Sequence, residues 1–260
     1  MLGTGARLGA RAPERECSNT AIVVDRSECD TAVASLPIVE IGDAQIITRR
    51  LSDTAQISWV ITRSDGTEGE GPVALIERRE RGLVVRAQGT LRADLGRPRF
   101  RLMANNTILM IDSERCTNAD DPSTCQRTAQ LMLKSGNRFV REPIRHRETG
   151  RCLGTSEIPL ARTVTHTLGN GWERTFALNA SLEESGSGLL VHETVSVTDR
   201  DPRSPVVPPR PFREVSADRE LAHGSTWTAE SGALLQRTLI ELASVEAPLA
   251  TNATGESDER

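Results

Sequence analysis

LVVRAQGTLRADL, residues 83–95, alternates apolar or small side chains with polar ones along its whole length. The alternating set comprises Leu83, Val85, Ala87, Gly89, Leu91, Ala93 and Leu95. A period of two is typical of a β-strand that has one buried face and one solvent-facing face. Gly96-Arg97-Pro98 then interrupts the pattern, and apolar strand-like segments resume at residues 99–103 and 107–111. This part of the sequence therefore predicts strands that double back on one another.

The same organisation recurs further along the chain, most clearly at residues 162–198. Gly169-Asn170-Gly171 and residues 185–188 are turn signals that separate three alternating segments. Pairing Leu168 with Trp172 would place His166 opposite Arg174, and pairing Leu182 with Val191 would place Arg174 opposite Asp199. Consecutive reversals of this kind predict a meander of antiparallel strands.

Two local features leave alternatives open. The register at 162–198 turns Glu193 inward opposite Ala180, and because a buried carboxylate is unfavourable we expect a bulge or an edge position that exposes it. Residues 225–230 and 233–242 flank Ser231-Gly232 and predict a final hairpin. The alternative is a helix, because Leu235, Leu239 and Leu242 also fit one helical face.

The predicted fold is mainly β, with little helix. We expect a single antiparallel meander-type domain at residues 20–245, closed or partly open as a barrel, with a two-sheet sandwich as the alternative. Prolines at 202, 205, 208, 209 and 211 predict an extended connector at residues 200–212. Residues 1–19 form a loosely attached or disordered lead, and residues 246–260 form a flexible polar tail.

Composition disfavours several classes of protein. The 260-residue chain has a net charge of −4 with acids and bases interleaved, so we expect no broad positive field that recruits DNA or an anionic membrane. The most basic stretch, residues 138–151, contains one phenylalanine and lacks the aromatic surface of a single-strand binder. No segment has the length and hydropathy of a transmembrane helix. Lys134 is the only lysine, which suggests codon bias in a GC-rich genome before any special use of guanidinium groups.

Five cysteines stand at positions 17, 29, 116, 125 and 152 without zinc-site spacing. Cys116 and Cys125 flank a polar loop and predict a disulfide across a hairpin end, while Cys17 and Cys29 could close a second loop. The alternative is five reduced thiols. The disulfides would imply an extracytoplasmic protein in the periplasm, envelope or secreted fraction. Residues 1–16, however, contain no apolar core of the kind that a signal peptide needs.

The strongest candidate for a site is the row formed by His166, Arg174 and Asp199. It could hold an anionic ligand, or Arg174 and Asp199 could tune His166 as a base. The alternative is a salt bridge that closes the open end of the sheet. Nucleophile-elbow, phosphate-loop and metalloprotease motifs are absent from the sequence, so we predict no catalytic residue, no metal site and no cofactor.

Three functions are compatible with these observations. The first is a non-enzymatic envelope or secreted protein that binds a partner or belongs to an assembly. The second is a carrier with an interior cavity for a small apolar or amphipathic ligand, for which the small residues Ala87, Gly89 and Ala93 could leave space. The third, least favoured, is a hydrolase that uses the His166 row. The partner is therefore predicted to be an unknown protein or small ligand.

Overall fold

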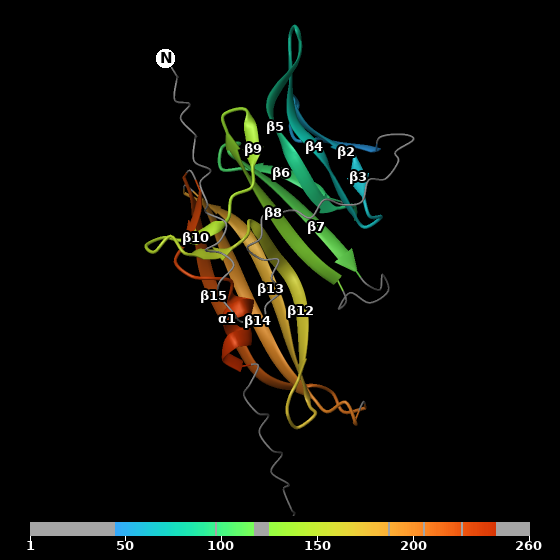
Figure 1. Ribbon diagram of the computed structural model, residues 1–260, viewed down its shortest axis with the longest axis vertical. Coiled ribbons are helices and arrows are strands. Elements are labelled where there is room, and N and C mark those ends of the chain that lie inside the picture. The colour runs from blue at the N-terminus through green and yellow to red at the C-terminus, as the bar shows by residue number, and fades with distance from the viewer. Residues whose placement is uncertain are drawn as a thin grey trace, which may run out of the picture.

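The computed structural model describes residues 45–96, 98–116, 125–186, 188–204, 206–224 and 226–242 (Figure 1). Within these ranges the chain forms a 16-stranded sheet and a single helix, which confirms the mainly β prediction. No helix in this part of the chain is long and apolar enough to cross a membrane. The predicted lead, residues 1–19, and the predicted tail, residues 246–260, lie outside the described ranges.

The strands fall into three consecutive groups along the chain. The N-terminal arm consists of β1 (Gln45–Arg50), β2 (Ala55–Ile61), β3 (Arg63–Ser64), β4 (Glu68–Arg79) and β5 (Gly82–Asp94). The central group consists of β6 (Arg99–Met103), β7 (Ile108–Cys116), β8 (Cys125–Ser135) and β9 (Arg138–Val140). The C-terminal arm consists of β10 (Ile144–His146), β11 (Cys152–Gly154), β12 (Glu157–Thr167), β13 (Glu173–Ser185), β14 (Gly188–Arg200), β15 (Arg210–His223), β16 (Trp227–Ala229) and the helix α1 (Leu234–Leu242).

The sheet is mixed and is not closed into a barrel. Its main path runs β1-β2-β4-β5-β9-β8-β12-β13-β14-β15-β16-β10-β11, with β6-β7 attached to β8. Most neighbours are antiparallel, but β5 pairs with β9 and β10 pairs with β16 in parallel. The prediction of a purely antiparallel meander was therefore wrong at these two joints, where segments from different hairpins meet instead of consecutive strands.

The joint between the N-terminal arm and the central group depends on a glycine. β5 pairs with β9 only at Gln88 and Arg138, next to Gly89. A Cβ atom at Gly89 would lie 2.6 Å from the carbonyl oxygen of Phe139, so any side chain would force the two strands apart. The small residue at position 89 allows a close backbone approach and leaves no interior space.

The hairpin formed by β7 and β8 lies between two hydrophobic cores. Ile108 and Met110 belong to the C-terminal core, while Leu109 and Ile111, which alternate with them, belong to the N-terminal core. β8 is divided in the same way, and Met132 is buried in the N-terminal core. A run of consecutive apolar residues is typical of a strand covered on both faces.

β5 departs from the simple alternation predicted for residues 83–95. Leu75 pairs with Ala87 but Ile76 pairs with Val85, so Arg86 is an extra residue in a β-bulge. An extra residue reverses which face each following side chain occupies. Ala87, Leu91 and Ala93 are buried as predicted, whereas Leu83 and Val85 lie on the opposite face and are exposed. The predicted inward orientation of these two residues was wrong.

The hairpins at residues 162–198 have the predicted register. His166 pairs with Arg174, and Arg174 pairs with Asp199 in turn. The proline-rich connector is the loop between β14 and β15, which pair with each other along most of their lengths. It therefore joins neighbouring strands of one sheet.

Two local predictions were wrong. Residues 233–242 were expected to complete a final hairpin, but Leu234–Leu242 form α1, the alternative that the leucine spacing allowed. Glu193 was expected to be exposed by a bulge, but it pairs with Ala180 without one and is buried. Both differences have the same physical reason. The helix α1 covers this face of the sheet, and the amide of its first residue, Leu234, donates a hydrogen bond to Glu193.

Candidate ligand-binding cleft

The predicted row of His166, Arg174 and Asp199 is assembled, but its members have different environments. Arg174 and Asp199 are buried, whereas His166 is exposed near the free end of β12. The His166 ring makes an edge-to-face contact with Phe176, with ring centroids 5.9 Å apart. The histidine therefore packs beside a buried ring, while the two charged residues lie deeper.

The guanidinium of Arg174 is occupied by protein groups. Its Nε and Nη2 donate to the two carboxylate oxygens of Asp199, each over 2.7 Å, and its Nη1 donates to the carbonyl oxygen of Leu242 over 2.9 Å. Its Cζ also lies 3.8 Å from the centroid of the Phe212 ring. A bidentate pair that also satisfies a helix C-terminus has a structural role. This arrangement favours the salt-bridge alternative over a ligand site.

Three of the five cysteines lie within the described ranges. Cys116 and Cys125 form a disulfide between the ends of β7 and β8, which confirms the predicted pairing. Glu114 lies close to both sulfur atoms, but sulfur atoms joined in a disulfide carry no thiolate that could bind a metal. Cys17 and Cys29, the predicted second pair, lie outside the described ranges, and Cys152 is half-buried, with its Sγ 3.8 Å from the carbonyl oxygen of Gly154.

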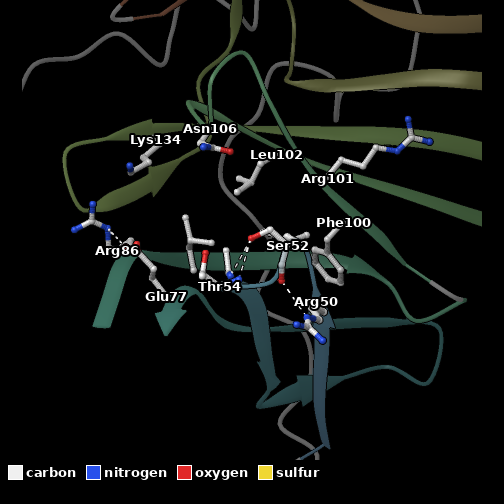
Figure 2. A pocket seen from close by; sticks show the side chains of 13 residues that line it. Arg50, Ser52, Thr54, Glu77, Arg86, Phe100, Arg101, Leu102, Asn106 and Lys134 are labelled. Carbon is white, nitrogen blue, oxygen red and sulfur yellow. Dashed lines mark hydrogen bonds and ion pairs between the residues drawn. The ribbon is translucent and has the colours of Figure 1, made fainter. Parts of the chain in front are cut away.

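A cleft lies elsewhere, between the N-terminal arm and the central group. Its volume is about 590 Å³. The β1-β2 turn, the outer part of β4-β5, β6 with the turn that follows it, and the end of β8 contribute its walls (Figure 2). The lining residues are Arg50, Leu51, Ser52, Thr54, Ala55, Leu75, Glu77, Arg86, Phe100, Arg101, Leu102, Asn106 and Lys134.

The charged residues of the cleft are mostly basic. Arg86 Nε lies 2.9 Å from Glu77 Oε2, and Arg50 Nη2 lies 3.1 Å from Asp53 Oδ1. Lys134 and Arg101 make no ion pair or side-chain hydrogen bond within the described ranges. In Figure 2, Lys134 and Arg86 lie on one side of the cleft, while the Arg101 guanidinium extends away from the other labelled residues. Lys134 is therefore the cleft cation that is best placed to meet an anion.

The remaining walls combine apolar side chains with small polar groups. Leu75 and Phe100 are buried members of the N-terminal core, whose edge the cleft exposes. The Ser52 hydroxyl accepts hydrogen bonds from the backbone of Thr54 and Ala55, which fixes the β1-β2 turn that forms one rim. Apolar walls with a few placed polar groups are typical of small-molecule sites.

The turn between β6 and β7 has an uncommon backbone conformation beside the cleft. Ala104, Asn105 and Asn106 all have positive φ angles, of 48°, 55° and 66°. Non-glycine residues rarely adopt this region, and such residues concentrate at functional sites. Thr107 Oγ1 donates to the carbonyl oxygen of Ala104 over 2.6 Å, and the Lys134 amide donates to that of Thr107 over 2.7 Å. The turn is thereby fixed against the strand that carries Lys134.

Sequence reasoning did not find this cleft, since its residues come from separate elements between positions 50 and 134 and share no motif or spacing. The one relevant signal was the single lysine, which composition alone explained as codon bias. No protein-family model matches the chain, and no curated protein or solved structure matches it either.

Proposed function

We propose that this protein is a non-enzymatic binding protein whose cleft holds a small ligand with an anionic group and an apolar body. The observation that carries the proposal is Lys134, a cation without an ion-pair partner in the described part of the chain, in a cleft walled by Leu75, Phe100 and Leu102. An ammonium group at the side of an apolar cleft favours a carboxylate or phosphate over a neutral group.

This proposal combines the first two functions that the sequence allowed and changes the place of the ligand. A carrier with a closed barrel would hold its ligand inside, but this sheet is open and the two hydrophobic cores fill the spaces on either side of β7-β8. The cleft instead lies at the edge of the N-terminal core. The Cys116–Cys125 disulfide supports an extracytoplasmic location for such a protein.

A hydrolase built on His166 has less support. Arg174 and Asp199 are committed to each other and to Leu242, so neither is placed to orient or ionise the exposed histidine ring.

The single lysine allows a direct test of ligand binding. Reductive methylation with ¹³C-formaldehyde keeps the ammonium charge and labels only the Lys134 side chain and the chain's α-amine. Dodecanoate, dodecanol and dodecyltrimethylammonium share one apolar tail and differ in the charge of the head group. We expect dodecanoate to shift the Lys134 methyl signal in a saturable way, to bind about three- to fivefold more tightly than dodecanol, and to exceed dodecyltrimethylammonium by a larger factor.

Variants locate the interaction. Lys134→Gln should weaken dodecanoate binding about three- to fivefold, the range of a partly exposed ion pair. Leu102→Asn should weaken binding of both dodecanoate and dodecanol, because it removes part of the apolar wall. Arg138→Gln is the matched control, since it removes one positive charge from the exposed first residue of β9, outside the cleft. Equal affinity for all three head groups, or equal effects of the Lys134 and Arg138 variants, would contradict the proposal.

A further inference from the structure

The end of the β4-β5 hairpin carries a cluster of exposed apolar side chains. Leu83, Val84 and Val85 are 65%, 37% and 55% exposed. Figure 1 shows this end of the hairpin extending away from the other strands. We name residues 76–86 the hairpin tip. Consecutive exposed apolar residues at a projecting point indicate an interaction surface, since isolated ones are ordinary but clusters are not.

The bulge at Arg86 gives the hairpin tip two different faces. Ile76 pairs with Val85 and Arg78 pairs with Leu83, so these four residues share the face opposite the core side. Glu77 pairs with Val84 and lies 2.9 Å from Arg86 and 3.4 Å from Arg79. One face is therefore mainly apolar and the other is charged, as in an amphipathic helix that lies in a membrane interface.

The charges of the hairpin tip favour an anionic partner. Residues 76–86 contain four arginines and two glutamates. Glu77 forms ion pairs with Arg79 and Arg86, while Arg78 and Arg81 make no ion pair within the described ranges. Arginine side chains beside exposed apolar groups suit a surface of lipid phosphates, because the guanidinium binds phosphate in a bidentate manner.

We propose that the hairpin tip docks on an anionic lipid surface, with Leu83 and Val85 inserted among the head groups and the free arginines contacting lipid phosphates. A stable protein partner requires roughly 800 Å² from each side, which a few side chains on a projecting hairpin do not supply. A membrane imposes no such requirement, because a few inserted apolar groups and nearby basic residues add to one another. This proposal does not depend on the cleft having a ligand.

Flotation of the full chain with vesicles tests the docking. We expect binding to vesicles of equal parts phosphatidylcholine and phosphatidylglycerol, and at least tenfold weaker binding to phosphatidylcholine alone. Raising the salt concentration from about 50 to 500 mM should weaken binding several-fold, because the ionic contribution is screened. No binding to the anionic vesicles, or equal binding to both compositions, would overturn the proposal.

Three variants assign the binding to residues. Leu83→Asn with Val85→Asn should lower the vesicle partition at least tenfold, since each apolar side chain withdrawn from water contributes roughly a factor of ten. Ile46→Asn is the matched control: Ile46 is 60% exposed on β1, away from the tip, and its replacement should leave binding unchanged. Lys134→Gln should also leave vesicle binding unchanged, which separates this proposal from the cleft. Unfolding midpoints verify that each variant is folded.

Two other results would overturn the proposal. Vesicle binding that survives the Leu83 and Val85 changes but is lost in Lys134→Gln would assign lipid contact to the cleft. A dimer in sedimentation velocity that the Leu83 and Val85 changes dissociate would assign the apolar tip to a second copy of the chain.

Discussion

Two ion pairs lie beneath α1 on the inward face of β13, β14 and β15. Arg174 and Asp199 form one, and Glu193 with Arg219 forms the other, with Arg219 Nε 3.3 Å from Glu193 Oε2. Burial lowers the pKa of the Arg219 guanidinium, and the charge of Glu193 opposes this effect. A buried charge is tolerable only when paired, so each member of a pair makes the other possible.

His192, on the outer face of the same sheet, should give stability a pH dependence. Its Nδ1 lies 2.8 Å from Asp218 Oδ1, and this hydrogen bond raises the pKa of His192 above its ordinary value of 6.5. The stabilisation from this pair is complete below the pKa that His192 has in the unfolded chain, and it is lost as the pH rises through the higher pKa that His192 has in the folded protein. We therefore expect His192→Gln to reduce the unfolding free energy more at pH 5.5 than at pH 8.5, measured by urea denaturation.

Asp218→Asn tests the same interaction from the other partner. It should reproduce the pH-dependent part of the His192→Gln effect, and an NMR titration should show a lower His192 pKa in this variant. A stability difference that is the same at both pH values would show that the pair does not contribute through the charge of the histidine.

The helix α1 is fixed at both ends by the sheet that it covers. The Leu234 amide donates to Glu193 Oε1 over 3.3 Å at the first residue, and Arg174 donates to the Leu242 carbonyl oxygen at the last. These positions match the helix dipole, since a carboxylate lies at the N-terminus and a guanidinium at the C-terminus. Leu234, Leu235 and Leu242 are buried between these ends.

Glu193→Ala should therefore be strongly destabilising. It leaves Arg219 buried without its counter-charge and removes the acceptor of the Leu234 amide, for an expected loss of about 3–5 kcal/mol in the unfolding free energy. Glu193→Gln, which keeps the acceptor, should lose less. Glu241→Gln is the control, because Glu241 makes an exposed ion pair with Arg213 and should lose under ~1 kcal/mol. Similar losses for the buried and exposed variants in urea denaturation would contradict this account of α1.

These elements show where sequence periodicity succeeds and where it fails. The register of 162–198 was predictable because two short turns fix the pairing of the strands that follow them. The environment of Glu193 was not, because its partner Arg219 lies on β15 and the covering helix follows later still. The bulge at Arg86 was equally hidden, since leucine and valine at alternate positions are consistent with both faces of a strand.

The β7-β8 hairpin connects the two hydrophobic cores of the molecule. Its side chains alternate between them, and a disulfide joins the ends of its strands at Cys116 and Cys125. A rigid element shared by both cores should make them unfold together. Trp59 and Trp227 report on this, because one is buried in each core.

We expect removal of the disulfide to destabilise both cores equally. The chain-entropy contribution for cysteines nine residues apart is about 2–3 kcal/mol. In protein labelled with 5-fluorotryptophan, the ¹⁹F signals of Trp59 and Trp227 should lose their native intensity at one urea midpoint, and Cys116→Ser with Cys125→Ser should lower that midpoint for both. Cys152→Ser should leave it unchanged. Separate midpoints for the two tryptophans would mean that the hairpin does not couple the cores.

The candidate cleft could not be predicted because its walls come from distant parts of the chain. Lys134 ends a strand of the central group, whereas Arg86 and Leu75 come from the N-terminal arm, and the two groups meet at the joint near Gly89 and in the shared N-terminal core. The predicted row of His166, Arg174 and Asp199 was found because all three residues lie on consecutive hairpins. Contacts between consecutive strands of a meander can be predicted from the turns that join them, but contacts between strands far apart in the sequence cannot.

The unpaired residue Arg86 determines which face of β5 the apolar side chains of the hairpin tip occupy, because β5 has one residue more than β4 at this point. Inserting one residue between Leu75 and Ile76, opposite Arg86, would restore unbroken alternation from Leu83 to Ala93, so Leu83 and Val85 would share the face of Ala87. The composition of the tip would otherwise be unchanged, with the same apolar side chains and all four of its arginines. A protein with one more residue in β4 would thus present these apolar side chains to its own interior instead of to its surroundings.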